Sequence, residues 1–237
     1  MDKHLIKACA GVALAALAGQ FLLGCGSAGS SRSSAPARSA GVSTSVPFPV
    51  AVGDTWTYTV EIAGQPVPAG LVEKITDTTA VPGGLRVSMA ITSSVFGIPQ
   101  TTHEDYLVGT DGSISFPPGP IASLMSPVNA DKVIVPPLSV LNSGRSVTWD
   151  DKIPPGDVRV TVRGGGTASV TVPAGTYRVT VVNMTASATI SGVDKPFVVV
   201  RRLWFAPHVG EVGEEFFNAS SGSGSGVTVK LQSFTAG

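Results

Sequence analysis

The chain has 237 residues, and its 16 basic and 16 acidic side chains balance to a formal net charge of zero. No basic cluster is larger than Arg201-Arg202, so the charge pattern gives no support to nucleic-acid binding. Charged residues make up only 14% of the chain, whereas Gly, Val, Thr and Ser are abundant, a mixture that favours β-strands and turns over helices. We therefore expect an all-β protein.

Residues 1–24 have the organisation of a secretory signal peptide. Lys3 and Lys7 precede an apolar stretch at 8–19, and Leu22-Leu23-Gly24-Cys25 follows it directly. This tetrapeptide resembles a bacterial lipobox, after which the signal is cut and the cysteine is acylated. The apolar stretch is shorter than the roughly 20 residues of a membrane-spanning helix. Ordinary secretion, with cleavage elsewhere and no acylation, is the alternative.

The cysteines agree with acylation at Cys25. The chain has two cysteines, and Cys9 would leave with the signal peptide, so the mature chain has no disulfide and begins at Cys25. Each buried methylene of an acyl chain contributes about 0.8 kcal/mol to membrane binding. We expect a lipid-anchored protein of the cell envelope. Gly26 in place of an aspartate favours, by the sorting rule of similar Gram-negative lipoproteins, the periplasmic side of the outer membrane.

The rest of the chain divides into a tether and one domain. Residues 25–46 hold the acylated cysteine and a small, polar segment without periodicity, which predicts a flexible tether. Residues 47–237 are long enough for a single all-β domain with its own core.

Alternating apolar residues predict the strands of the first half. Trp56, Tyr58, Val60 and Ile62 have a period of two, and Asp111-Gly112 is a strong hairpin turn. The expected segments are 55–62, a weaker 71–80, 85–92, 101–108 and 113–116.

Residues 117–145 contain six prolines, which cannot donate to a sheet ladder. We expect a long excursion with one helical turn at 121–125. Loops of this length are often functional, so the segment is a candidate lid or partner contact.

The second half predicts a further run of strands. Gly164-Gly165-Gly166 and residues 173–176 are the expected turns, and a change of parity near Val182 predicts a β-bulge or a strong bend. Residues 197–200 are apolar on both faces, which indicates a central strand. The expected segments are 147–149, 158–163, 168–172, 177–190, 197–200 and 227–231.

Three motifs support a family resemblance: Val52–Tyr58 (VGDTWTY), Val172–Tyr177 (VPAGTY) and Trp204–Val212 (WFAPHVGEV). They resemble a group of bacterial envelope lipoproteins with the pattern VGxxWxY, VPAGTY and WxAPxVGxV. The resemblance implies a strongly curved antiparallel sheet, an open or half barrel. It implies no catalytic residues.

Two sets of side chains could form metal sites or, as the alternative, belong to a solvated surface. His103 and Asp105 lie on one face of a predicted strand with Glu104 on the other, and His208 could join them. The aspartates near the Pro154-Pro155 turn could bind calcium, but they lack the spacing of a known loop. They are Asp150, Asp151 and Asp157. We predict neither a metal nor another cofactor.

No catalytic set is assembled in the sequence. Glu211, Glu214 and Glu215 could pair as acid and base, but nothing nearby indicates a pocket. No Gly-x-Ser-x-Gly elbow exists.

The favoured function is therefore a non-enzymatic binding or accessory module. The concave face of a curved sheet could hold an apolar ligand such as a lipid. The predicted lining residues are Trp56, Tyr58, Met89 and Trp204; the plainer interpretation is that they fill an ordinary core. A structural protein that grips an envelope protein by a sheet edge or the Pro-rich loop is the alternative, and a hydrolase with a scattered site is a third.

Overall fold

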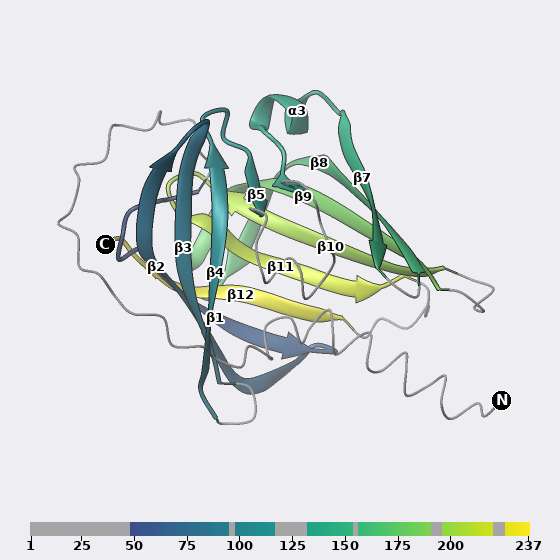
Figure 1. Cartoon of the computed structure of the whole chain (residues 1–237). Helices are drawn as coiled ribbons and strands as arrows, with labels where there is room; N and C mark the ends of the chain where they lie inside the picture. Colours follow the sequence, from purple (N-terminus) through teal and green to yellow (C-terminus); the bar gives the residue numbers. More distant parts are fainter. Residues whose placement is uncertain (1–47, 95–97, 117–131, 154–155, 191–195, 220–225) are drawn as a thin grey trace.

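The computed structural model describes residues 48–94, 98–116, 132–153, 156–190, 196–219 and 226–237 (Figure 1). The predicted signal peptide, Cys25 and the tether lie outside the described residues. Among the described residues, no helix has the length and apolar character needed to cross a membrane.

Strands form almost all of the described chain, as predicted. Their bounds and that of one short helix are β1 Thr55–Ile62, β2 Gln65–Val81, β3 Gly84–Ser93, β4 Gln100–Gly109, β5 Ile114–Phe116, β6 Lys132–Val135, α3 Leu138–Asn142, β7 Ser146–Ile153, β8 Gly156–Val172, β9 Gly175–Ile190, β10 Phe197–Ala206, β11 Gly210–Asn218 and β12 Val227–Thr235.

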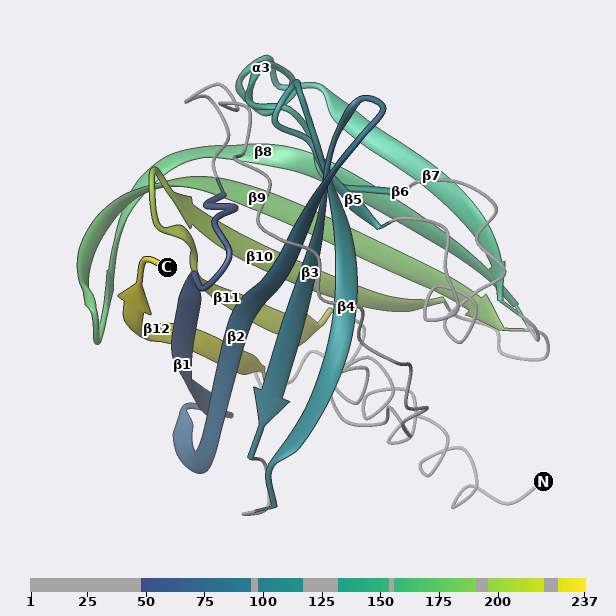
Figure 2. The same ribbon diagram turned by 60° about the vertical axis from the view of Figure 1, so that its left-hand side comes forward.

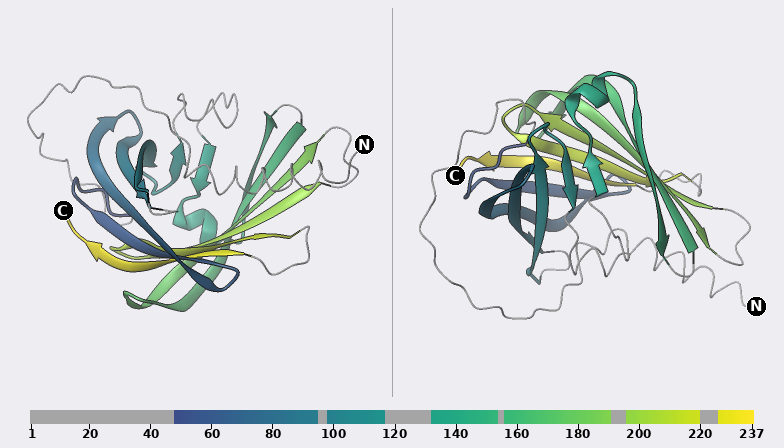
Figure 3. Two further views of the ribbon diagram at one scale, coloured as in Figure 1. Left: turned by 90° about the horizontal axis from the view of Figure 1, so that it is seen from below. Right: turned by 45° about the horizontal axis from the view of Figure 1, so that its top comes forward.

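The strands form one antiparallel sheet with the order β6-β5-β4-β3-β2-β1-β12-β11-β10-β9-β8-β7. Each half is a meander of strands that follow one another in the sequence, and the β1–β12 ladder joins the two halves. Figures 2 and 3 show the sheet curling so that β1 and β12 lie between the arm of β2–β4 and the arm of β8–β10. The sheet is nearly closed into a barrel, with a seam between β6 and β7. The predicted strong curvature is confirmed.

The predicted turn at Gly164–Gly166 is wrong. β8 runs through these glycines, and its pairing with β9 shifts between Gly164 and Thr167, opposite Thr180–Val182. The predicted bulge is therefore present, but the extra residue lies in the partner strand β8. Glycine is needed here because Gly166 has a φ of +79° and because a Cβ on Gly164 would lie 2.0 Å from the carbonyl oxygen of Leu141 in α3.

Part of the Pro-rich segment belongs to the sheet. Residues 132–135 form the edge strand β6, and 138–142 form α3, whereas the helical turn predicted at 121–125 lies outside the described residues. Val133, Ile134 and Val135 have the β-branched side chains that strands favour. Pro136 and Pro137 follow the strand directly, where they take no place in the ladder.

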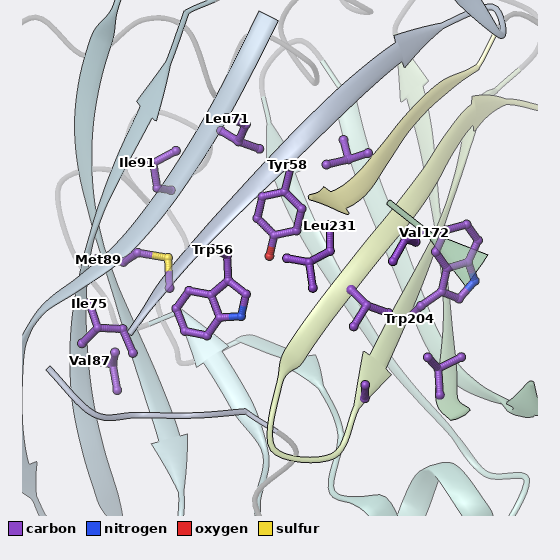
Figure 4. Packing of buried hydrophobic residues seen from close by; sticks show 14 of the residues in the cluster. Trp56, Tyr58, Leu71, Ile75, Val87, Met89, Ile91, Val172, Trp204 and Leu231 are labelled. Carbon is purple, nitrogen blue, oxygen red and sulfur yellow. The ribbon is translucent and has the colours of Figure 1, made fainter. Parts of the chain in front are cut away.

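Two apolar clusters form the core. The larger one joins β1–β4 to β8–β12 and contains Trp56, Tyr58, Met89 and Trp204 (Figure 4). The smaller one, called here the seam cluster, joins β5, β6 and α3 to β8–β10. Its buried members are Ile114, Ile134, Val135, Leu141, Val160, Val162, Val182, Leu203 and Phe205. Side-chain packing thus connects the two ends of the sheet where the ladder does not.

Candidate functional site

The structure places three of the four predicted lining residues on one face of the sheet. Trp56 and Tyr58 of β1 and Met89 of β3 are at most 2% exposed and pack in the larger cluster (Figure 4). Trp204 is buried in the same cluster, beside Val172, but on the opposite face of β10 from Leu203 and Phe205, which belong to the seam cluster. Whether the four residues line a ligand stays a prediction.

Both aromatic residues of β1 are fixed by polar and ring contacts. The Trp56 indole Nε1 donates a hydrogen bond of 2.6 Å to the carbonyl oxygen of Val209, and its ring lies 5.1 Å from Phe48 and 5.3 Å from Phe234. The Tyr58 hydroxyl donates to the Glu211 carbonyl oxygen at 3.1 Å. Because buried polar atoms need such partners, the two rings are well held whether or not a ligand binds beside them.

A polar group lies among the apolar side chains of this concave face. It is called here the concave acidic group, and its members are Tyr58 of β1, Glu73 of β2, Glu104 and Tyr106 of β4, Arg201 of β10, and Glu211 and Glu214 of β11. The strand register puts them on the inner face: Glu73 is opposite Trp56, and Glu104 is opposite Met89. Tyr106 and Arg201 interact electrostatically although five strands separate β4 from β10 in the sheet. The curvature of the sheet brings them together.

Hydrogen bonds organise part of this group. Arg201 Nε donates to a Glu214 carboxylate oxygen, and the two side chains are only 28% and 11% exposed. The Tyr106 hydroxyl donates to Glu104 Oε2 at 2.6 Å. The Tyr58 hydroxyl, whose proton is donated to the Glu211 carbonyl oxygen, also lies near the Glu73 carboxyl and lowers its pKa. Arg201 and Tyr106 therefore hold two of the four carboxyl groups.

Burial changes the acidity of the group. Burial, together with the nearby charges of Glu214 and Glu104, raises the pKa of Glu73 to about 7, although Arg201 and the Tyr58 hydroxyl act in the opposite direction. Burial and Glu214 raise the pKa of Glu211 well above its ordinary value. Burial also raises the pKa values of Tyr58 and Tyr106, so both phenols remain hydrogen-bond donors near neutral pH.

The guanidinium of Arg201 stays charged. Burial lowers its pKa, but Glu214 and Glu211 raise it by more, so the net shift is upward. The concave acidic group thus combines one permanent cation with carboxyl groups that can hold a proton near neutral pH.

Sequence reasoning named Tyr58, Glu104, Glu211 and Glu214 in different candidate roles, and missed Glu73, Tyr106 and Arg201. Glu73 has the inward parity of Leu71 and Ile75, and a charged residue at such a position is a usable signal, but 71–80 was only a weak strand prediction. The third glutamate proposed with Glu211 and Glu214, Glu215, points the other way and pairs with Arg202 at 2.9 Å. The acid–base trio is therefore not assembled.

The remaining candidates whose side chains the structure describes are exposed; the side chain of Asp151 lies outside the described residues. His103 and Asp105 are exposed while Glu104 lies inward, so their predicted orientation is confirmed. His208 is exposed in the β10–β11 turn. Within the described part of the chain, no group of three or more His, Cys, Asp and Glu side chains could hold a metal ion. Asp150 pairs with Arg159 at 2.7 Å, and Asp157 is exposed.

Comparison with known proteins shows the fold and no family. No family model and no curated protein matches the chain. A candidate lipoprotein from Parabacteroides distasonis superimposes with a TM-score of 0.58 at 14% identity, over 81% of this chain and 99% of that one. A candidate exported protein with a YmcC-like fold from Bacteroides fragilis gives 0.49 at 17% identity, over 80% and 98%. The chain thus shares the fold of the Parabacteroides protein.

Proposed function

We propose that this protein is a lipid-anchored module of the cell envelope that binds an apolar ligand, such as a lipid, on its concave face and has no enzymatic activity. The observation that carries the proposal is the composition of that face. Aromatic and aliphatic side chains surround a small polar group, the combination with which proteins hold an apolar molecule and fix its polar end.

The location rests on the sequence and agrees with the fold. Leu22–Cys25 is the predicted acylation motif, and residues 26–46 would lift the domain from the membrane surface. The solved structure whose fold this chain shares is itself described as a candidate lipoprotein. Membrane lipid attached at Cys25 is thus the first proposed partner.

Native mass spectrometry of residues 47–237 tests the ligand. This segment contains every described strand and both apolar clusters. We expect a stoichiometric lipid adduct on the purified protein. Met89→Lys should remove the adduct while the circular dichroism spectrum is retained, because a lining residue tolerates a charge that a filled core does not. Asp105→Asn, on the exposed face of β4, is the matched control and should keep the adduct.

Two outcomes oppose the binding function. A bare protein mass would indicate that the concave face is filled by its own side chains. Loss of the folded spectrum in Met89→Lys would show that the core around Met89, which is 2% exposed, is fully packed and leaves no room for a ligand.

An interaction protein is the second candidate, favoured by the sheet edges. Within the described residues, β6 and β7 each pair on one side only, which leaves backbone groups that another strand could meet. Affinity capture of envelope proteins with and without residues 117–131 tests the contribution of the Pro-rich segment. An unchanged set of partners would exclude that segment.

A further inference from the structure

The concave acidic group contains more negative than positive charge. Its four carboxyl groups are Glu73, Glu104, Glu211 and Glu214, and Arg201 is its one cation, so full ionisation would leave three uncompensated negative charges. Arg201 is engaged by Glu214, and Glu104 accepts from Tyr106. Glu73 and Glu211 therefore carry most of the imbalance.

These charges come from the two halves of the sheet. Glu73 and Glu104 belong to β2 and β4, whereas Glu211 and Glu214 belong to β11, beyond the β1–β12 ladder. The β1–β2 register sets Glu73 opposite Trp56, one inward position from Tyr58, and the Tyr58 hydroxyl donates to the Glu211 carbonyl oxygen of β11 at 3.1 Å. The titratable and charged groups that act on Glu73 are Tyr58 from β1, Glu104 and Tyr106 from β4, Arg201 from β10, and Glu211 and Glu214 from β11. Repulsion between Glu73 and the β11 carboxylates acts across the join between the halves.

We propose that the concave acidic group is a proton-sensitive device, in which a proton held by Glu73 or Glu211 keeps the two halves of the sheet together and its loss weakens their contact. This role concerns the fold itself and does not depend on a ligand. It gives the protein a response to the pH of its surroundings.

The direction of the response follows from the acidity of Glu73. Its pKa is about 7 in the folded protein against 4.5 for an ordinary glutamate. The folded state therefore binds more protons than the unfolded state between these values, and stability falls as the pH rises through that window. The lower pH is the stabilising one, the reverse of the behaviour of carboxylates in salt bridges.

Thermal unfolding of the intact chain tests the device, with Cys25→Ala to remove the predicted lipid. We expect the unfolding midpoint to fall by on the order of 5 °C between pH 5 and pH 8, and Glu73→Gln to reduce that fall by about half. Glu61→Gln is the matched control, since Glu61 pairs with Lys230 on the outer face at 2.8 Å. It should keep the full fall.

A second measurement locates the effect and covers the failure of Glu73→Gln to fold. In the unsubstituted protein, the Glu73 carboxyl carbon should titrate near pH 7. Amide exchange, corrected for its intrinsic pH dependence, should quicken at pH 8 in the β1–β12 ladder more than in the β8–β9 ladder. A Glu73 titration near 4.5, a midpoint that is flat or rises with pH, or an equal fall in Glu73→Gln would overturn the proposal.

Discussion

The seam cluster and the concave acidic group occupy the same inner face of one sheet, yet the first is apolar and the second is charged and polar. The seam cluster is aliphatic apart from Phe205, and it connects the two ends of the sheet. The concave acidic group places carboxyl groups, phenols and a guanidinium beside the join between the halves. Strand β10 contributes to both: Leu203 belongs to the first and Arg201, two residues earlier on the same face, to the second.

The two groups have different roles: the seam cluster closes the sheet, and the concave acidic group gives the inner face its charged and polar groups. Apolar burial contributes roughly 25 cal/mol per Å², and it needs no partner of defined geometry. Buried charge contributes little to stability unless it is well paired, and here the pairing is incomplete. The seam cluster therefore stabilises the closed form of the sheet. The concave acidic group supplies ionisable side chains on the inner face and lowers the stability of the fold.

The largest expected effect comes from placing a charge in the seam cluster. Leu203→Asp buries an unpaired carboxylate at a position that is 2% exposed and opposite Glu214. We expect a loss of more than about 4 kcal/mol in the free energy of unfolding, measured by urea denaturation. Leu203→Met, which keeps the volume, should cost less than about 1.5 kcal/mol. Equal losses in the two variants would show that shape rather than polarity decides at this site.

A smaller, pH-dependent effect is expected when the cation is removed from the concave acidic group. Arg201→Met leaves Glu214 without its partner and takes away the charge that lowers the pKa of Glu73. Breaking a fully buried ion pair lowers the free energy of unfolding by about 3–5 kcal/mol. Because the Arg201 side chain is 28% exposed, we expect a smaller loss of about 2 kcal/mol at pH 8. At pH 5 the loss should be smaller, since Glu73 is then protonated. Urea denaturation at both pH values measures the loss of unfolding free energy. Identical losses at pH 5 and pH 8 would contradict the electrostatic coupling of Arg201 to Glu73.

The smallest effect is expected on the outer face. Glu61→Gln breaks the pair with Lys230, whose side chains are 26% and 31% exposed. Such pairs contribute about 0–1 kcal/mol, because water screens them and their side chains lose freedom on pairing. The same denaturation experiment should give a loss below about 1 kcal/mol. A loss as large as that of Arg201→Met would remove the distinction between the inner and outer faces.

Local alternation made most of the fold predictable. The period of two over 55–62 and 85–92 reports directly which side chains face the core, and β1 and β3 occupy these segments. The glycines at 164–166 misled the prediction, because a glycine serves a turn or a bulge equally well. The choice between a turn and a bulge depends on α3, which packs against Gly164. The local sequence pattern did not predict this helix.

The concave acidic group was beyond sequence reasoning for a different reason. Its members come from five strands, and each looks locally like a single inward polar residue. Only the order of the strands and the curvature of the sheet bring Glu73 close to Glu214. Parity could have marked Glu73 and Glu104 as inward, but no local pattern states that they meet the residues of β11.

The β1–β12 ladder has a consequence for how the chain folds. In the described sheet every other pairing joins strands that are neighbours in the sequence, but β1 also pairs with β12, where the Thr59 hydroxyl donates to the carbonyl oxygen of Lys230, 171 residues away. Local meanders form quickly, whereas a contact of such separation must wait for loop closure. In a chain synthesised from its N-terminus, β12 is made long after β1. The free edge of β1 therefore stays open to wrong pairing until Val227–Thr235 arrives, which makes this strand the point at which misfolding would begin.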